Sequence, residues 1–194
     1  MITYVINRSD RPQRLRDTIE ELKRVDLNAK RFSAIINKRG WKGARDSHLA
    51  VMELCKDENM FMVLEDDVKF LSPPNGLIDT AMRQLPDDWD MLYLGCSPQK
   101  PQERYSDNLF RVNHAWCLHA VIWHNREGGA MEYMLNHRGD INKIDVYLSE
   151  VIHPLFNCFT IFPMVATQRV TGESDTCHRS DVSTIEINYT KYCV

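Results

Sequence analysis

Residues 60–68 read Met-Phe-Met-Val-Leu-Glu-Asp-Asp-Val, an apolar run that ends in acids. The run 60–64 is short, apolar and without helical periodicity, which favours a buried strand. Three acids, Glu65, Asp66 and Asp67, follow it directly. Open α/β sheets bind their ligands outside the carboxyl ends of the strands. Adjacent carboxylates repel each other, so we expect a compensating cation, such as a divalent ion that also holds phosphate oxygens. The alternative is a solvated acidic turn.

Strand-like and helical segments alternate along the rest of the chain. A first strand is expected at residues 4–6, followed by a helix with Pro12 in its first turn and Ser9 or Asp10 as its cap. We expect further strands at 31–34, 60–64, 89–95, 109–123 and 159–165, and helices at 44–55, 78–85, 128–135 and 143–151. This order predicts an α/β fold with a Rossmann-like, mostly parallel sheet flanked by helices. Residues 96–108 are expected to form a mobile loop, and 172–194 a polar tail or lid.

Length and composition indicate a globular chain of one domain, residues 1–194. Apolar residues make up 43% and charged residues 26%, and the net charge is −3. This charge argues against a protein that grips nucleic acid by bulk electrostatics, although a local basic groove stays open. The compact basic cluster available for such a groove is Lys38, Arg39, Lys42 and Arg45, whose alternative role is a solvated loop.

Several motif classes are absent from the sequence. It has no GxGxxG and no Walker loop, so dinucleotide and P-loop chemistry are unsupported. Six cysteines are scattered without a CxxC pair, and no apolar run is long enough to span a bilayer. The N-terminus lacks the basic and apolar regions of a signal peptide. These features predict a cytoplasmic protein.

Five segments in order carry a resemblance to a known family. They are Val5–Arg8 with Arg11 and Arg14, Gly43 with Ser47-His48, Val63–Val68, Trp89–Gly95 and Asp145–Leu148, with a weaker match at Pro163–Gln168 and Ser174-Asp175. Together they resemble glycosyltransferase family 25, the lipooligosaccharide and procollagen galactosyltransferases with a GT-A fold. The resemblance implies metal-dependent transfer of a sugar, with inversion, from a nucleotide-sugar such as a UDP-sugar to an acceptor hydroxyl.

The resemblance also implies which residues hold the donor. Glu65, Asp66 and Asp67 would form a DXD-type site in which Asp67 binds Mn²⁺ or Mg²⁺ and Glu65 faces the nucleotide. Asp66 would lie beside them or act as a structural carboxylate. The other donor-binding candidates are Asn7, Arg8 and Arg11 for the base and ribose, and Ser47 and His48 near the start of a helix. Their alternatives are solvated charges for the arginines and a packed side chain for the histidine.

Asp145 is the candidate general base. An inverting transferase needs a carboxylate that takes the proton of the acceptor hydroxyl as it attacks. The alternative is an acid that only complements the helix dipole, with Asp140 and Glu150 as other candidates. His178 is a candidate second metal ligand, since Mn²⁺ accepts imidazole nitrogen. Gln168 and Arg179 would reach the diphosphate if the tail closes, and Trp116 is either a sugar platform or a core residue.

Two other functions compete with glycosyl transfer. Acids at a strand end also serve metal-dependent nucleotidyl or phosphoryl transferases, and the same site without catalysis would make a nucleotide-sugar-binding module. The acceptor stays open between a glycan, a protein hydroxyl and a modified nucleobase.

Overall fold

A computed structural model describes residues 1–169, 189 and 191–193, and helices and strands alternate through most of this part. The strands are β1 (Ile2–Asn7), β2 (Lys30–Ser33), β3 (Met60–Glu65), β4 (Val68–Phe70), β5 (Met91–Tyr93), β6 (Ser97–Pro98), β7 (Glu103–Arg104), β8 (Leu109–Arg111), β9 (Ala115–Trp116), β10 (Ala120–His124), β11 (Cys158–Ile161) and β12 (Ala166–Gln168). The helices are α1 (Pro12–Arg24), α2 (Gly40–Leu54), α3 (Asn75–Met82), α4 (Ala130–Asn136), α5 (Ile144–Tyr147), the π-helical turn η1 (Leu148–Ile152) and α6 (His153–Leu155).

An eight-stranded sheet with the order β2-β1-β3-β10-β5-β11-β8-β7 forms the centre of the described chain. The segment β1-α1-β2-α2-β3 is a parallel unit, in which Val5 of β1 pairs with Arg31 on one side and Leu64 on the other. β5, β11 and β7 run in the same direction as this unit, whereas β10 and β8 run antiparallel to their neighbours. The predicted α/β class with a mostly parallel sheet is confirmed, with these two reversed strands as the exception.

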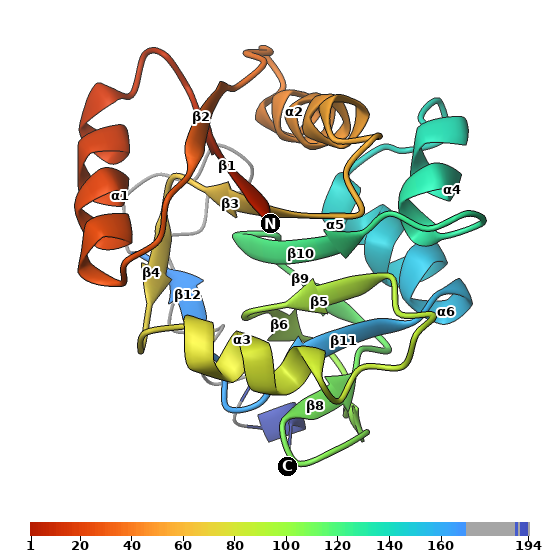
Figure 1. Cartoon of the computed structure of the whole chain (residues 1–194). Helices are drawn as coiled ribbons and strands as arrows, with labels where there is room; N and C mark the ends of the chain where they lie inside the picture. The colour runs from red at the N-terminus through yellow and green to blue at the C-terminus, as the bar shows by residue number, and fades with distance from the viewer. Residues whose placement is uncertain (170–188, 190, 194) are drawn as a thin grey trace.

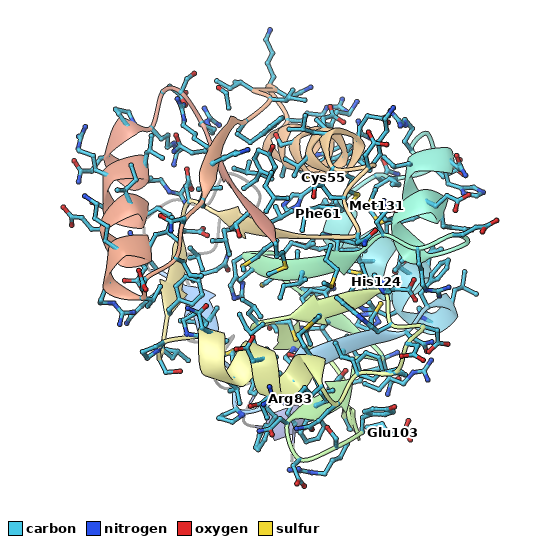
Figure 2. The ribbon with its side chains drawn as sticks, in the orientation of Figure 1. Cys55, Phe61, Arg83, Glu103, His124 and Met131 are labelled. Atoms are coloured by element: carbon cyan, nitrogen blue, oxygen red, sulfur yellow. The ribbon has the colours of Figure 1, made fainter. Side chains whose placement is uncertain are left out.

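Each face of the sheet packs against its own set of helices. α1 and α3 cover one face, and α2, α4, α5 and η1 cover the other (Figure 1). Side chains of β3 alternate between the two cores, as the pleat requires. Phe61 and Val63 enter the α2 side, and Met62 and Leu64 enter the α1 side. Figure 2 shows Phe61 close to Cys55 and Met131, at the junction of β3, α2 and α4.

Two segments in the middle of the chain differ from the expectation. Residues 109–123 are not one strand but the three strands β8, β9 and β10, because Cys117 has a φ of 75° and turns the chain between the last two. Residues 96–108 are not simply a loop, since they contain β6 and β7 and bury Cys96 and Ser97. No glycine stands at this turn, so the pattern of apolar and polar residues alone gave no indication of a positive φ at Cys117.

The start of α1 also differs in detail. Its N-cap is Arg11 with no side-chain cap, Pro12 lies in the first turn as expected, and the Asp10 carboxylate instead accepts hydrogen bonds from Arg8. On α1, Ile19 is exposed, whereas the neighbouring Thr18 is buried. Thr18 is drawn inward because its hydroxyl donates to the backbone oxygen of Asp66 at 2.7 Å.

The described C-terminal residues pack on the sheet beside β8. Tyr189 and Cys193 form a small apolar cluster with Phe110 and Met164, and the Tyr189 hydroxyl donates to the carbonyl of Ile161. Residues 172–188, 190 and 194 of the expected tail lie outside the described chain. All cysteines that the structure describes are unpaired. No helix in the described ranges is long and apolar enough to cross a membrane.

Candidate active site

The pleat of β3 distributes the acidic residues between the two faces of the sheet. Glu65, the last residue of β3, continues the series of Phe61 and Val63 and lies on the α2 side, where it meets His48. Asp66 continues the series of Met62 and Leu64 and lies on the α1 side. Consecutive acids therefore have different neighbours because of the two-residue period of a strand.

Asp66 is buried and tied to the elements around it. Its carboxylate accepts from Asn7 Nδ2 at 2.7 Å and pairs with Arg14 Nε at 3.0 Å. Asn7 is itself buried at the end of β1, and its amide oxygen accepts from Arg31 Nε at 3.1 Å. These contacts link the carboxyl ends of β1, β2 and β3 to α1. They are the contacts of a structural carboxylate, which the sequence left open as the alternative for Asp66.

Asp67 lies between a cation and a second carboxylate. Arg14 Nη2 lies 2.9 Å from its carboxylate, so one guanidinium spans Asp66 and Asp67. Gln168 Nε2 lies 3.5 Å from both oxygens of Asp67 and 3.5 Å from Glu65 Oε2. Burial and the charge of Glu65 raise the pKa of Asp67 to about 7, although Arg14 opposes the shift. Glu65 and Asp67 therefore converge on one point, where a cation would relieve their repulsion.

Glu65 keeps its charge because of a buried histidine. Burial alone would raise the pKa of Glu65, but the hydrogen bond and charge of His48, together with His119 and Arg14, hold it below its ordinary range. His48 Nε2 lies 3.1 Å from Glu65 Oε1, and its ring is almost fully buried in α2. The backbone N–H of Glu65 donates to the carbonyl of His119 at 2.9 Å. His48 thus holds the carboxylate of Glu65 and His119 holds its backbone, while part of the side chain stays exposed.

A close crossing of two segments brings Gln168 to the acids. Val165 and Ala166 both donate backbone hydrogen bonds to the carbonyl of Leu94, and a Cβ on Gly95 would lie only 1.8 Å from the Ala166 carbonyl oxygen. Only glycine permits this approach. β12 then pairs with β4 and places Gln168 opposite Val68, directly after the acidic cluster.

Asp145 reaches the same region from the far part of the chain. It lies in the first turn of α5 and accepts a backbone hydrogen bond from Cys117, the residue with positive φ. Burial, and then the charge of Glu65, raise the pKa of Asp145 to about 7, whereas His48 lowers it. These influences place Asp145 within electrostatic range of Glu65 and His48. The other acids considered for this role, Asp140 and Glu150, are exposed.

The remaining predicted residues have varied surroundings. Arg8 pairs with Asp10, and Arg11 donates its backbone N–H to the carbonyl of Arg8 at 3.1 Å. Ser47 is buried, donating to the Gly43 carbonyl at 2.6 Å and accepting from the N–H of Ile35 at 2.8 Å, so its hydroxyl is occupied within the protein. Trp116 is 45% exposed, which excludes the core alternative. His178 and Arg179 lie outside the described residues.

Three residues of this region had no site role predicted from the sequence, although Arg14 belongs to a segment that carries the family resemblance. Arg14 bridges Asp66 and Asp67, Thr18 holds the backbone of Asp66, and His119 contacts Glu65 through its carbonyl. Arg14 and Thr18 are spaced by one helical turn on α1, which would have marked a shared face. His119 carried no local signal, because its partner is distant in sequence.

The donor chemistry of the site suits a hard divalent ion, but the ligand set is incomplete. The carboxylates of Glu65 and Asp67 are the oxygen donors that Mg²⁺ and Mn²⁺ prefer. Within residues 1–169 and the few described beyond them, no group of three His, Cys, Asp or Glu side chains is gathered to hold a metal. An ion here would need further ligands, such as phosphate oxygens.

Comparison with known proteins supports the fold. No protein-family model and no curated protein matches the sequence. Among solved structures, the chain is similar to a glycosyltransferase involved in the glycosylation of the major capsid of PBCV-1, at 8% identity and a TM-score of 0.57 over 96% of this chain and 100% of that one. It is also similar to A197 from STIV, at 14% identity and a TM-score of 0.54 over 88% and 86%. At such identities the likeness shows a shared GT-A-like α/β fold.

Proposed function

We propose that this protein is a metal-dependent glycosyltransferase of the family 25 type, which moves a sugar from a UDP-sugar to an acceptor hydroxyl with inversion. The observation that carries the proposal is that Asp145 lies within electrostatic range of Glu65, and Glu65 within range of Asp67, at the carboxyl end of a GT-A-like sheet. Glu65 and Asp67 suit a diphosphate and its cation. Asp145, from a distant part of the chain, suits proton transfer.

Asp145 has the properties of a general base near neutral pH. Its pKa of about 7 lets the carboxylate accept the proton of an attacking hydroxyl while the protonated form remains accessible. The backbone N–H of Cys117 orients the carboxylate. In the proposed reaction, the acceptor oxygen bonds to the anomeric carbon, the bond to the diphosphate breaks, and the acceptor proton passes to Asp145.

The acidic cluster serves the leaving group in this proposal. Asp67 would hold Mn²⁺ or Mg²⁺ together with diphosphate oxygens, and His178 stays a candidate ligand. The bound ion would neutralise the charge that builds on the departing UDP. Arg14 and Gln168 position the Asp67 carboxylate, and His48 keeps Glu65 ionised toward the nucleotide. Asn7, Arg8 and Arg11 lie after β1 and remain candidates for the base and ribose.

A screen of UDP-sugars tests the proposal. The purified protein is incubated with each UDP-sugar and Mn²⁺, with and without a chelator, and the products are identified. We expect slow release of UDP and free sugar that depends on the ion, since water can replace an absent acceptor. Asp67→Asn serves as the control for background hydrolysis.

The products separate the proposed function from its rivals. Pyrophosphate released from a nucleoside triphosphate and a sugar phosphate would instead identify a nucleotidyl transferase. Binding of UDP-sugars without turnover, in the presence of sugar and glycan acceptors, would identify a binding module.

A further inference from the structure

The connection between β2 and α2 carries an unusual combination of side chains. Ile35 and Ile36 are 42% and 52% exposed, and the basic residues Lys38 and Arg39 next to them are exposed as well. Trp41 follows, half-buried at the start of α2. Exposed aliphatic residues occur singly on most surfaces, whereas here two adjacent ones lie beside cations. We call Ile35, Ile36, Lys38, Arg39, Trp41 and Lys42 the β2–α2 surface.

The charge of this region is opposite to that of the whole protein. Between Leu27 and Met52 the sequence has six basic residues and one acid, Asp46, whereas the net charge of the chain is −3. Asp46 is paired with Arg45 at 2.7 Å, so it does not neutralise the cations of the loop. Lys30 and Arg31 extend the basic surface onto β2, the edge strand of the sheet. The region therefore presents a local positive patch that complements an anionic surface.

The surface is held in a defined shape. A Cβ on Gly43 would lie 2.5 Å from the Ile35 carbonyl oxygen, so α2 packs directly on the loop backbone, and Ser47 accepts from the N–H of Ile35. The Asn37 side chain accepts from the N–H of Arg39 at 3.0 Å. Lys42 Nζ lies 5.5 Å from the centre of the Trp41 ring, which keeps the cation beside the aromatic face. The exposed isoleucines are thus presented by a supported loop.

We propose that the β2–α2 surface binds the headgroup region of a membrane rich in anionic phospholipids. The isoleucines would enter the acyl boundary, Trp41 would lie at the interface, and the cations would contact lipid phosphates. The loop forms one rim of the molecule in Figure 1, so a flat bilayer can approach it. The loop follows the carboxyl end of β2. Asn7 and Glu65 lie at the same end of the sheet, since Asn7 pairs with Ser33 and Ile6 with Glu65.

Exposed aliphatic side chains favour lipid over nucleic acid as the partner. Phosphate contacts alone would explain the cations, but nucleic acids engage aromatic side chains by stacking and offer little to adjacent isoleucines. A bilayer accommodates both kinds of side chain at one surface. The cations contact the lipid phosphates, and the aliphatic side chains lie below them at the acyl boundary.

Sedimentation with vesicles tests this proposal without any nucleotide-sugar. The full chain is mixed with vesicles of phosphatidylcholine and phosphatidylglycerol, or of phosphatidylcholine alone, at low and high salt. We expect binding to the anionic vesicles that weakens with salt. Lys38→Gln with Arg39→Gln should weaken binding about 25-fold, since each basic group near an anionic surface contributes roughly fivefold. Ile36→Ser should weaken it about tenfold, with little dependence on salt.

A matched control removes two cations elsewhere. Lys23→Gln with Arg83→Gln makes the same change of net charge on exposed positions of α1 and at the end of α3. Figure 2 shows Arg83 at the opposite end of the molecule from the loop. We expect unchanged vesicle binding for this control, and circular dichroism should show that all variants are folded.

Three results would overturn the inference. They are no binding of the wild type to anionic vesicles, equal loss in the control and in the loop variant, and binding of duplex DNA in place of vesicles. Because the assay uses no donor, its outcome is independent of whether the protein transfers sugar.

Discussion

Glu65 and Asp66 are neighbours in sequence, yet their surroundings are opposite in kind. Asp66 is buried on the α1 side and held by Asn7, Arg14 and its own backbone contact to Thr18. Glu65 lies on the α2 side, partly exposed, among His48 and the ionisable groups Asp67 and Asp145. One acid of the cluster therefore organises the fold, and the others are available for chemistry.

The strongest test of this division is Asp145→Asn. If the α2 side performs proton transfer, the variant should lose transfer by a factor of about a hundred to ten thousand, the usual contribution of a general base. Binding of UDP should be unchanged, because Asp145 does not serve the diphosphate. The measurement is single-turnover transfer together with calorimetric titration of UDP. Wild-type turnover in Asp145→Asn would remove this residue from the mechanism.

Asp66→Asn tests the α1 side through stability. Removing one partner of a buried ion pair leaves Arg14 with less compensation, so we expect the free energy of unfolding to fall by about 3 kcal/mol. The matched control is Asp10→Asn, an identical change at an exposed pair with Arg8, where we expect no measurable effect. Urea unfolding monitored by circular dichroism compares the two. Equal stability of both variants would contradict a structural role for Asp66.

Asp67→Asn separates ion binding from folding. We expect the affinity for Mn²⁺ in the presence of UDP to fall about tenfold to a hundredfold, because one charged ligand is lost. Thermal stability should be retained or increased, since the repulsion between Asp67 and Glu65 is removed. Electron paramagnetic resonance of Mn²⁺ reports the binding directly. Unchanged Mn²⁺ affinity would exclude Asp67 as a ligand.

The pH dependence gives the smallest and most graded effect. Burial raises the pKa of Asp145 and Asp67 to about 7, so the folded protein binds more protons than the unfolded chain between about pH 4 and pH 7. The free energy of unfolding contributed by these groups therefore falls as the pH rises through this window. The contribution of Glu65 to the free energy of unfolding has the opposite sign. Its pKa is lowered in the folded protein, so its contribution is lost only as the pH falls below the ordinary pKa range of a glutamate.

Activity should follow the ionised form of the base. We expect kcat/KM to rise with pH and level off above about 7, since Asp145 must be deprotonated to accept a proton. Thermal unfolding and kcat/KM are measured over the same pH series. In the double variant Asp145→Asn with Asp67→Asn, the rise in stability toward acidic pH should be reduced. Parallel stability curves for the wild type and this variant would refute the proposed titration.

The parallel part of the fold was predictable from local sequence. The apolar run 60–64 followed by acids indicated β3 and the edge at which it ends, and the start of the helix at Pro12 was recognised. The reversal of β10 was not predictable, because direction depends on pairing with β3 and β5 and leaves no local pattern. The strand breaks around Cys117 depend on a backbone conformation that is uncommon for residues other than glycine.

The candidate site, like the fold, was predictable from the sequence only in part. Asp145 was singled out because it opens a segment that carries the family resemblance and because an inverting transferase needs a separate carboxylate as base, and the structure brings it within electrostatic range of Glu65. Its hydrogen bond from Cys117 and the bridge by Arg14 could not be inferred, because both depend on contacts between residues far apart in sequence. The separation of Glu65 from Asp66 follows from strand periodicity, but which side holds a compensating cation depends on the tertiary fold.

The reversed strand β10 has a consequence for biosynthesis. β1, β2 and β3 are complete once residue 65 has left the ribosome, but the free edge of β3 pairs only with residues 120–124. An unpaired strand edge is a template for association with other chains. Nascent chains between these two lengths therefore expose the apolar edge of β3 until β10 emerges, and this is the interval in which a chaperone would protect the growing protein.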